Sequence, residues 1–459
     1  MQRWRPTILL IKQHTSLNEG RKKHLSTKLT WLIVLLTVLL AKNGSGAFAA
    51  SDLSKQPIVD EIEILGLWRT KPSVVRQELL FRENDTLTTK DLYTSIQRLK
   101  NLQIFSKVIP LLTLKPNNRV KLTLQLQEKW TTIPYANLSA GGGTTYAFAG
   151  IYDINTFGRY IETGIQYDNW NGRHGGWLWM RNPRFLNQRL LFGFDLMKTK
   201  RARQLYTNEA ISQGSYVLNT NRLKLIIKKE ITPYFQIGAE NEINNSNIAL
   251  HKTNSITDPQ TKTLLTGSEP HTAIFNTLFI ELGKLNYDNY LVQGKFSKLA
   301  IKLSNQSLGS DISSTQIDWF NRIFWRLPYH ANLGLRFNFG WTNTNDIQYL
   351  YYIGGFKNIR GYFDGQFRSK TYWQVNAEYR IPSYRSNWLV LQHIFFIDAV
   401  GTGNELNDLK RNGLQYSSTG FGLRIISPRI YSFNGRIDIA PFTSGNSPSQ
   451  ISFGAQQFF

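Results

Sequence analysis

Residues 373–381, with the sequence WQVNAEYRI, decide the fold, because apolar and polar residues alternate along them without interruption. Successive side chains of a β-strand point to opposite faces, so this segment forms a strand with one apolar and one polar face. The same two-residue period recurs at residues 332–339 and 431–439. From Pro134 to the end of the chain, sixteen segments have strand character. We therefore predict a large sheet with one apolar face and one polar face.

Lipid is the best cover for the apolar face of this sheet. No helix and no second apolar layer is available in the sequence to cover so many aromatic-rich strand faces, although a soluble sandwich would alternate too. Connection lengths also alternate, as in outer-membrane barrels, where short periplasmic turns follow long extracellular loops. The short turns are residues 155–159, 182–188, 285–289, 327–330 and 382–387, and the long connections are 243–270, 343–371 and 400–417. Residues 131–459 are predicted to form an all-β, 16-stranded antiparallel transmembrane barrel.

The N-terminus has the pattern of an export signal. Basic residues between Arg21 and Lys28 precede an apolar run at residues 29–41, and Ala47-Phe48-Ala49 offers a small-x-small cleavage site. The run is shorter than the roughly 20 residues of a spanning helix, which makes a membrane anchor the weaker alternative. We predict a signal peptide over residues 1–50 and a linker over 51–56.

Residues 57–130 have the pattern of a small α+β domain. A strand is expected around residues 58–64, and Pro72 opens a first helix. A second helix is expected after Thr88 or Thr89, either of which can cap it. Two strands at residues 108–114 and 120–126 flank the turn Pro116-Asn117-Asn118. The predicted order is β-α-α-β-β.

This domain resembles a polypeptide-transport-associated (POTRA) domain. The resemblance rests on Ile64-Leu65-Gly66 and on the segment from Leu99 through Ile104-Phe105 to Val108. Two positions depart from the usual pattern, because Leu67 stands where an Asn commonly follows the glycine and Gln103 where a glycine usually ends the second helix. A non-glycine residue in a left-handed helix cap costs about 1 kcal/mol, which packing can offset.

The most specific motif lies in the sixth long loop, at residues 351–362, YYIGGFKNIRGY. It resembles the loop signature of the BamA/TamA-type outer-membrane assembly-factor (bacterial surface antigen) superfamily, which includes two-partner secretion transporters. The resemblance implies that the loop folds into the lumen and that its arginine meets an acidic residue on the inner wall. The loop residues concerned are Gly354, Gly355, Ile359, Arg360, Gly361 and Tyr362.

The acidic partner is expected on the polar faces of the strands that follow the loop. Phe396-Ile397-Asp398 matches the aromatic-x-Asp wall motif of the resembled family, so Asp398 is the first candidate and Glu378 the second. Gly420, Gly422 and Arg424 share a face of the next strand, and the glycines leave room for a loop pressed against the wall. An ordinary polar lumen network is the alternative interpretation of these residues.

The C-terminal strand carries a further resemblance. It alternates and ends in an aromatic residue, with Phe453 inside it and Phe459 last, as in the recognition signal of outer-membrane barrels. Residues 137–143, which include three consecutive glycines, are expected to form a weak first barrel strand.

Composition and motifs exclude several function classes. The chain has no cysteine, its seven histidines show no metal spacing, and no Gly-x-Ser-x-Gly or His-Glu-x-x-His motif occurs. The formal charge is +23, but the basic residues are scattered among aromatics instead of clustered, which argues against nucleic-acid binding. We predict no catalytic site, no metal and no cofactor.

The resemblance implies a factor of the Gram-negative outer membrane that inserts, assembles or translocates polypeptides, with residues 57–130 in the periplasm. Its expected partners are unfolded outer-membrane or secreted polypeptides, outer-membrane lipids and an accessory periplasmic or inner-membrane protein. We further expect that the first and last barrel strands meet in a weak seam. Exporters of the resembled family usually carry two POTRA domains, and only one is recognised here, which favours insertion. The alternatives are a two-partner-type pore for one dedicated substrate and a passive porin or structural barrel.

Overall fold

The computed structural model describes residues 56–141, 144–170, 172–207, 209–250, 270–355, 358–411, 414–431, 433–444 and 450–455. The predicted signal peptide and Phe459 lie outside these residues. Within the described ranges, no helix is both long and apolar enough to cross a membrane.

The N-terminal domain has the predicted element order. A three-stranded sheet with the order β1-β3-β2 packs against two helices, and β1 runs parallel to β3. Its elements are β1 (Ile58–Leu65), α2 (Pro72–Arg76), α3 (Thr89–Asn101), β2 (Phe105–Lys115) and β3 (Arg119–Glu128).

Local sequence explains where the helix α3 begins and ends. Thr88 is the cap, because its hydroxyl accepts a hydrogen bond from the backbone N–H of Asp91 at 3.0 Å. Leu99 is fully buried in the domain core. Gln103 takes a left-handed conformation (φ 60°) two residues after the helix, where the resembled family usually has glycine. The departure at Gln103 therefore leaves the backbone turn intact.

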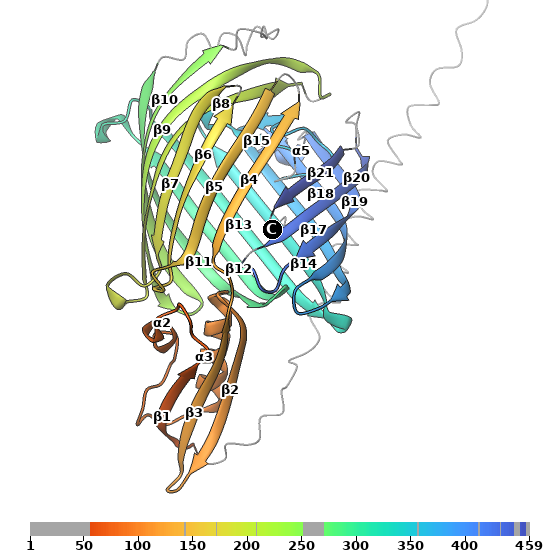
Figure 1. The fold of residues 1–459 in the computed structure, drawn as a ribbon. Helices are drawn as coiled ribbons and strands as arrows, with labels where there is room; N and C mark the ends of the chain where they lie inside the picture. Colours follow the sequence, from red (N-terminus) through yellow and green to blue (C-terminus); the bar gives the residue numbers. More distant parts are fainter. Residues whose placement is uncertain are drawn as a thin grey trace, which may run out of the picture. The chain divides into compact units, whose positions relative to one another are not determined.

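The second part of the chain is one antiparallel sheet of 16 strands, as predicted (Figure 1). Among the described residues, short helices lie in five of its connections: η1 (Phe185–Asn187), η2 (Gln306–Leu308), η3 (Pro328–His330), η4 (Ile347–Tyr349) and α5 (Asp408–Arg411). The strands are β4 (Thr132–Gly141), β5 (Thr144–Thr156), β6 (Ile161–Trp170), β7 (Arg173–Asn182), β8 (Leu190–Tyr206), β9 (Ser212–Thr232), β10 (Phe235–Leu250), β11 (His271–Asp288), β12 (Leu291–Ser304), β13 (Ser314–Leu327), β14 (Ala331–Thr342), β17 (Thr371–Arg385), β18 (Val390–Gly403), β19 (Leu414–Ile426), β20 (Asn434–Thr443) and β21 (Gln450–Ala455).

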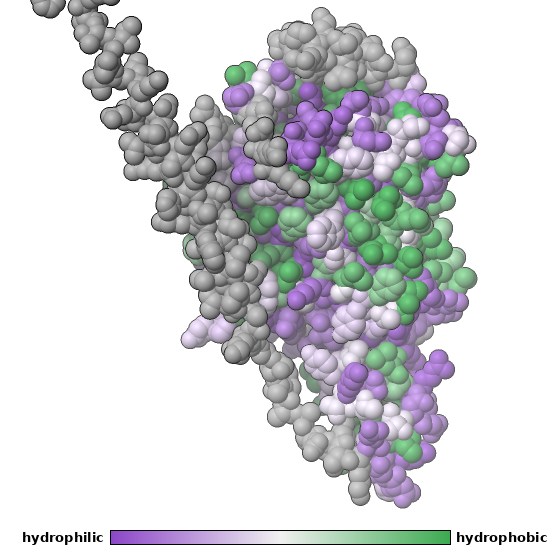
Figure 2. All heavy atoms as spheres, turned by 180° about the vertical axis from the view of Figure 1, so that it is seen from behind, coloured by the Kyte–Doolittle hydropathy of each residue, from purple (hydrophilic) through white to green (hydrophobic). Residues whose placement is uncertain are grey.

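Alternation along the strands separates the two faces of the sheet. On β17, Gln374, Asn376 and Glu378 are buried on the inner face, whereas Val375 and Tyr379 are 37% and 39% exposed on the outer one. Figure 2 shows the outer surface of the opposite side, where hydrophobic residues gather over the middle of the wall and hydrophilic residues lie beyond them. This reversal of the usual order, with polar residues buried and apolar residues outside, is what a barrel in lipid requires.

The strands β4 and β21 are the two edges of the sheet (Figure 1). No backbone pairing joins these two strands within their described residues, so the sheet is not closed there. The segment that leads into β4 is held at one point, because Trp130 donates its N–H to the carbonyl of Arg429 and accepts from the N–H of Tyr431, both at 3.0 Å.

Three predicted boundaries were wrong. The first barrel strand begins at Thr132 instead of Asn137, β10 continues to Leu250 inside the predicted loop 243–270, and β20 begins only at Asn434. Tyr431 therefore belongs to the turn before β20, where it packs on the core of the N-terminal domain. Alternation detects the residues that face an apolar surface, and it cannot distinguish lipid from the packed core of a neighbouring domain.

Candidate functional site

The sixth long loop, residues 343–370 between β14 and β17, is called loop six below. It contains a short helix η4 (Ile347–Tyr349) and a small hairpin of β15 (Tyr351–Ile353) with β16 (Phe367–Ser369). Gly354 has a φ of 137°, and a Cβ there would overlap the carbonyl oxygen of Phe363. Only glycine fits this position without strain, which explains one glycine of the predicted motif.

Arg360 of loop six binds Asp398 of β18 through two parallel hydrogen bonds. Its Nε lies 2.8 Å from Oδ2 and its Nη2 lies 2.8 Å from Oδ1, and its backbone N–H donates to Oδ2 at 3.1 Å. Both side chains are fully buried. Paired hydrogen bonds between a guanidinium and a carboxylate are short and directional, and the backbone contact adds a third fixed point. The loop backbone at Arg360 is therefore held against the wall in one orientation.

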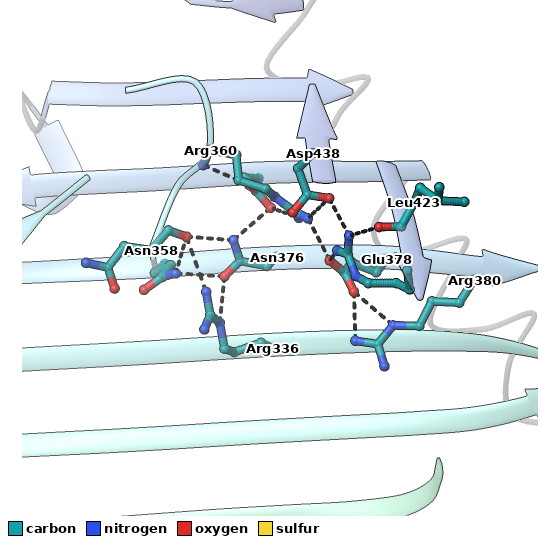
Figure 3. Close-up of polar contacts among 11 residues, drawn as sticks. Arg336, Asn358, Arg360, Asn376, Glu378, Arg380, Leu423 and Asp438 are labelled. Atoms are coloured by element: carbon teal, nitrogen blue, oxygen red, sulfur yellow. Dashed lines mark hydrogen bonds and ion pairs between the residues drawn. The ribbon is translucent and has the colours of Figure 1, made fainter. Parts of the chain in front are cut away.

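Glu378 of β17 is the second carboxylate that contacts Arg360 (Figure 3). Its Oε1 accepts from Arg360 Nη1 at 2.6 Å and from Arg424 Nη2 at 3.1 Å, while its Oε2 lies 2.7 Å from Arg380 Nη2. Asp438 of β20 binds Arg424 at 2.7 Å. Three carboxylates, on β17, β18 and β20, thus hold Arg360, Arg380 and Arg424, and each of these guanidiniums has a charged partner.

The guanidinium of Arg360 lies over the ring of Phe396, with 3.5 Å between the guanidinium carbon and the ring centroid. Gly420 makes room for this ring, because a Cβ there would lie 2.5 Å from Phe396 and would overlap the carbonyl oxygen of Ile439. A Cβ at Gly422 would overlap the carboxylate of Asp438. The glycines therefore leave room for wall side chains and not, as predicted, for the loop itself.

A backbone carbonyl of the loop forms the second anchor. The carbonyl oxygen of Asn358 accepts hydrogen bonds from Gln374 Nε2 at 2.5 Å, Asn376 Nδ2 at 2.9 Å and Arg336 Nη2 at 3.2 Å. Asn376 also donates to Asp398 Oδ1 at 2.8 Å. The hydrogen bonds to the Asn358 carbonyl and the ion pairs of Arg360 therefore belong to one connected network (Figure 3).

The motif residues Ile359 and Tyr362 extend the anchor to β19 and to the residue that follows β20. Ile359 and Tyr362 are buried with Phe367 in a cluster on the wall. The hydroxyl of Tyr362 lies 2.9 Å from the carbonyl oxygen of Ser417 and 2.8 Å from that of Ser444.

Loop six also contacts a distant part of the sheet. Phe363 stacks on Tyr206 of β8, with 5.0 Å between ring centroids and 7° between ring planes. The hydroxyls of Tyr352 and Tyr216, the latter on β9, are 2.9 Å apart. Since β8 and β9 are far from β17 and β18 in strand order, the loop bridges two parts of the inner wall.

The structure brings together most residues of the predicted site. Arg360, Asp398, Glu378 and Arg424 form one network, and Phe396 completes it. The described part of Phe453 is its backbone, which pairs with Ile437 in β21 and β20. Four residues of the network were not predicted as site residues: Asn358, Arg336, Asn376 and Asp438. The last three lie on strand faces that were predicted to be polar. In the described ranges, no group of three potential metal ligands occurs.

The comparison with protein families decides the classification. The model of the Omp85 superfamily domain matches residues 155–459. The chain belongs to the Omp85 superfamily. A second family model, the POTRA domain described as a surface antigen variable number repeat, matches residues 57–129. The predicted relationship, with a single POTRA domain before the barrel, is thereby confirmed.

Solved structures show the same fold at low sequence identity. BamA from Haemophilus ducreyi lacking POTRA domains 1–3 is 14% identical, with a TM-score of 0.52 over 88% of this chain and 84% of that chain. CdiB from Acinetobacter baumannii is 14% identical, with a TM-score of 0.54 over 86% and 73%. CdiB from Escherichia coli is 8% identical, with a TM-score of 0.58 over 88% and 75%. No curated protein matches the sequence.

Membership of this superfamily establishes the location and the broad role. The protein lies in the Gram-negative outer membrane with its POTRA domain in the periplasm. Members are transporters or assembly factors rather than enzymes, and the membership supports a role in the insertion or translocation of outer-membrane proteins.

Proposed function

We propose that this Omp85 protein inserts polypeptides into the outer membrane through a seam between β4 and β21. The observation that carries the proposal is the anchoring of loop six: Arg360 fixes the loop to β18 and β17, close to one edge of the sheet. The last strands are thereby held in place, and the joint between the two edges is left as the weakest part of the barrel.

Strand pairing supports this assignment of the joint. Within the described residues, β21 pairs only with β20 and β4 only with β5, so each edge strand has one unpaired side. An unpaired edge presents free N–H and C=O groups to an incoming strand, and such pairing depends little on side-chain sequence. A seam of this kind suits a protein that handles many different polypeptides.

The POTRA domain offers a second binding edge. In its sheet, β2 and β1 lie outermost, and β2 is an 11-residue strand that pairs with β3 on one side only. We propose that an unfolded client adds a strand to this domain before it reaches the seam. An accessory periplasmic protein would dock on the same domain.

A disulfide across the seam tests the proposal. The chain has no cysteine, so Leu138→Cys with Phe453→Cys, and the neighbouring registers along the same strands, create the only thiols. Oxidation is expected to stop the insertion of a client barrel into vesicles while the locked protein stays folded, and reduction is expected to restore insertion. Normal insertion by the oxidised protein would rule out the seam.

The matched control locks a strand pair that already exists. Ile439 and Ile451 are direct partners in β20 and β21, so Ile439→Cys with Ile451→Cys joins strands that need not part. This disulfide is expected to leave insertion unchanged. If it blocks insertion equally, loss of activity in the seam variant reflects oxidation damage or general stiffening.

Two other functions fit the same fold. A two-partner-type pore for one dedicated substrate would be favoured by a gene for a large secreted protein beside this one. A passive porin would form large, steady channels in planar bilayers whose conductance does not change in Arg360→Ala. Depletion of the protein followed by outer-membrane proteomics separates them from insertion, because only an insertion factor would lower the amounts of many barrels.

A further inference from the structure

The outer face of the wall from β6 to β11, strands that lie side by side in Figure 1, changes from apolar to polar between two adjacent rows of side chains. Each row consists of direct cross-strand partners. The apolar row, in which five of the six side chains are 37–55% exposed, comprises Ile165, Leu178, Leu196, Leu223, Ile243 and Ile274. The adjacent polar row comprises Tyr167, Gly176, Lys198, Asn221, Asn245 and Thr272.

This boundary lies on the extracellular side of the membrane. The first barrel strand follows the periplasmic POTRA domain, and the strands alternate in direction, so β8 runs away from the periplasm and reaches Leu196 before Lys198. On β9, Asn221 and Lys229 are eight positions apart, and the outward-facing residues between them are leucine or isoleucine. Eight positions span about 27 Å of strand, or about 20 Å across a membrane at a tilt of about 40°, close to the apolar band of outer-membrane barrels. The polar row therefore marks the outer edge of the hydrocarbon.

Two lysines without a partner face outward at this edge. Lys198 and Lys200 of β8 are exposed, while Thr199 between them is buried on the inner face. Within the described residues, neither ammonium has a hydrogen bond or an ion pair, whereas Lys224 and Lys228 on the inner face of β9 pair with carboxylates. Lysine binds phosphate as a point charge, so the pair offers a phosphate site at the level of lipid headgroups.

Asparagines extend this polar surface beside the lysines. Asn221 is the direct partner of Lys198, and Asn219 is the direct partner of Lys200. Asn219 also donates to Asn247 of β10 at 2.6 Å. Amide side chains donate and accept hydrogen bonds without charge, which suits the hydroxyls of a sugar. From β7 to β10 the polar row is about 14 Å wide, more than a single glycerophosphate headgroup covers.

A groove of about 730 Å³ joins the two rows on the outer face of β6 to β10. On β10 it is lined by Ile243 and Asn245 but not by Asn244 between them, which places it outside the barrel. Gly176, beside Lys198, contributes no side chain and leaves a gap in the polar row. The side chains of the apolar row line the groove below this gap. An acyl chain can therefore run from the gap toward the middle of the membrane while its headgroup stays at the lysines.

We propose that the outer face of β7 to β9 binds a phosphorylated glycolipid of the outer leaflet. Lys198 and Lys200 hold its phosphate, Asn219 and Asn221 bind its sugar hydroxyls, and one acyl chain lies in the groove below Gly176. The site goes beyond the proposed insertion of polypeptides, since it concerns the lipid beside the wall and not the client at the seam.

Native mass spectrometry of the full-length protein in detergent micelles tests the site. The probes are diphosphoryl lipid A, the same lipid with both phosphates removed, and phosphatidylglycerol. We expect diphosphoryl lipid A to bind at least tenfold more tightly than either comparison lipid. Equal binding of the phosphorylated and dephosphorylated forms, or of phosphatidylglycerol, would overturn the proposal. Displacement of lipid A by a tenfold excess of inorganic phosphate would show a general anion site and would also overturn it.

Variants assign the binding to the two lysines. Lys198→Gln with Lys200→Gln is expected to weaken lipid A binding at least tenfold, whereas Lys198→Arg with Lys200→Arg retains it and shows that the wall is folded. The matched control is Lys229→Gln, which removes a lysine from the outer face of β9 at the opposite end of the wall and is expected to leave the affinity unchanged. Wild-type affinity in the double glutamine variant, or an equal loss in Lys229→Gln, would refute a specific site.

Asn221→Leu tests the sugar contact separately. It is expected to weaken the binding of lipid A while the binding of phosphatidylglycerol stays as in the wild type. Unchanged lipid A affinity in this variant would overturn the assignment of a glycolipid.

A second copy of the chain is the other occupant that the spectra can detect. Dimers that disappear in the double glutamine variant, with lipid A binding unchanged, would assign this face to a neighbouring barrel and overturn the lipid site. Lipid binding is measured without a client, so a negative result in the seam experiment leaves the lipid site standing, and the reverse also holds.

Discussion

The inner face of the sheet carries charged residues in two regions that differ in what lies above them. The covered wall comprises Glu378, Asp398, Arg424 and Asp438 on β17 to β20, beneath loop six, and their side chains are at most 1% exposed. The open wall comprises Lys224, Glu240, Glu281 and Lys298 on β9 to β12, and their side chains are 10–25% exposed. Both regions follow the same alternation, so the covering loop and not the strand decides the burial of the charge.

The difference should appear in the cost of losing one charge. A charge left without its partner away from water costs several kcal/mol, whereas a partly solvated pair is worth about 0–1 kcal/mol. The covered wall is therefore expected to tolerate almost no substitution, and the open wall most of them. Four substitutions, taken from the largest expected effect to the smallest, test this contrast, and the last of them is compared with a matched substitution on the covered wall.

Asp398→Asn should have the largest effect. It removes the carboxylate that binds Arg360 at two points while the guanidinium stays buried, and we expect a loss of about 4 kcal/mol in the free energy of unfolding. Urea unfolding in micelles, followed by tryptophan fluorescence, measures it. The control is Glu405→Gln, an exposed carboxylate of the β18–β19 connection that should change stability little. Equal stabilities of the two variants would refute the special status of the covered wall.

Arg360→Lys separates the charge from its geometry. Lysine keeps the positive charge but cannot make the paired hydrogen bonds to Asp398, so we expect a loss of about 2 kcal/mol and faster proteolysis of loop six. Arg326→Lys is the matched control, because Arg326 is 29% exposed and lies 3.8 Å from Asp288. An unchanged rate of loop cleavage in Arg360→Lys would show that charge alone anchors the loop.

Gly420→Ala disturbs the covered wall without touching a charge. The new Cβ must displace the carbonyl oxygen of Ile439 and the ring of Phe396, on which Arg360 rests, and overpacking of this kind costs about 1–3 kcal/mol. Gly435→Ala is a close control, since its Cβ would meet only Ile425, at an ordinary 3.7 Å. If both variants unfold at the same urea concentration, the space between Gly420, Phe396 and the Ile439 carbonyl has no energetic role.

The fold was predictable because its signal is long and periodic. Alternation assigned the inner face that carries Glu378 and the outer face that carries Tyr379, and the structure has both as expected. The strand ends were less predictable, because Tyr431 lies in a turn and faces the POTRA core, an apolar environment with the same sequence signal as lipid. Nothing local in the sequence distinguishes the two environments.

The site was predictable only where side chains carry its chemistry. Arg360 and Asp398 were found through motifs, but Asn358 acts through its backbone carbonyl, for which the identity of the residue is no guide. For Asp438 the sequence predicted a polar face but not its ion-pair partner. The pairing with Arg424 of β19 depends on the register of β19 against β20 and on the length of the arginine side chain. The part of Gly420 was misassigned for a related reason, because its neighbour Phe396 lies on another strand.

Lys298→Met on the open wall should have the smallest effect. Lys298 lies 3.5 Å from Glu240 and 4.0 Å from Glu281, but Lys224 and Lys228 remain to pair with these carboxylates. Water reaches the site as well, so we expect a loss below about 1 kcal/mol that shrinks further in high salt.

The covered-wall counterpart of this variant is Arg424→Met, which also replaces a cation by an apolar chain. There Asp438 loses its 2.7 Å partner in a region closed to water, and the expected loss is about 3 kcal/mol with little dependence on salt. A similar loss in Lys298→Met and Arg424→Met, with the same salt dependence, would mean that loop six does not exclude water from the charges beneath it. The two walls would then differ in geometry but not in the energetic cost of losing a charge. The anchoring of the loop would have to rest on Ile359 and Tyr362.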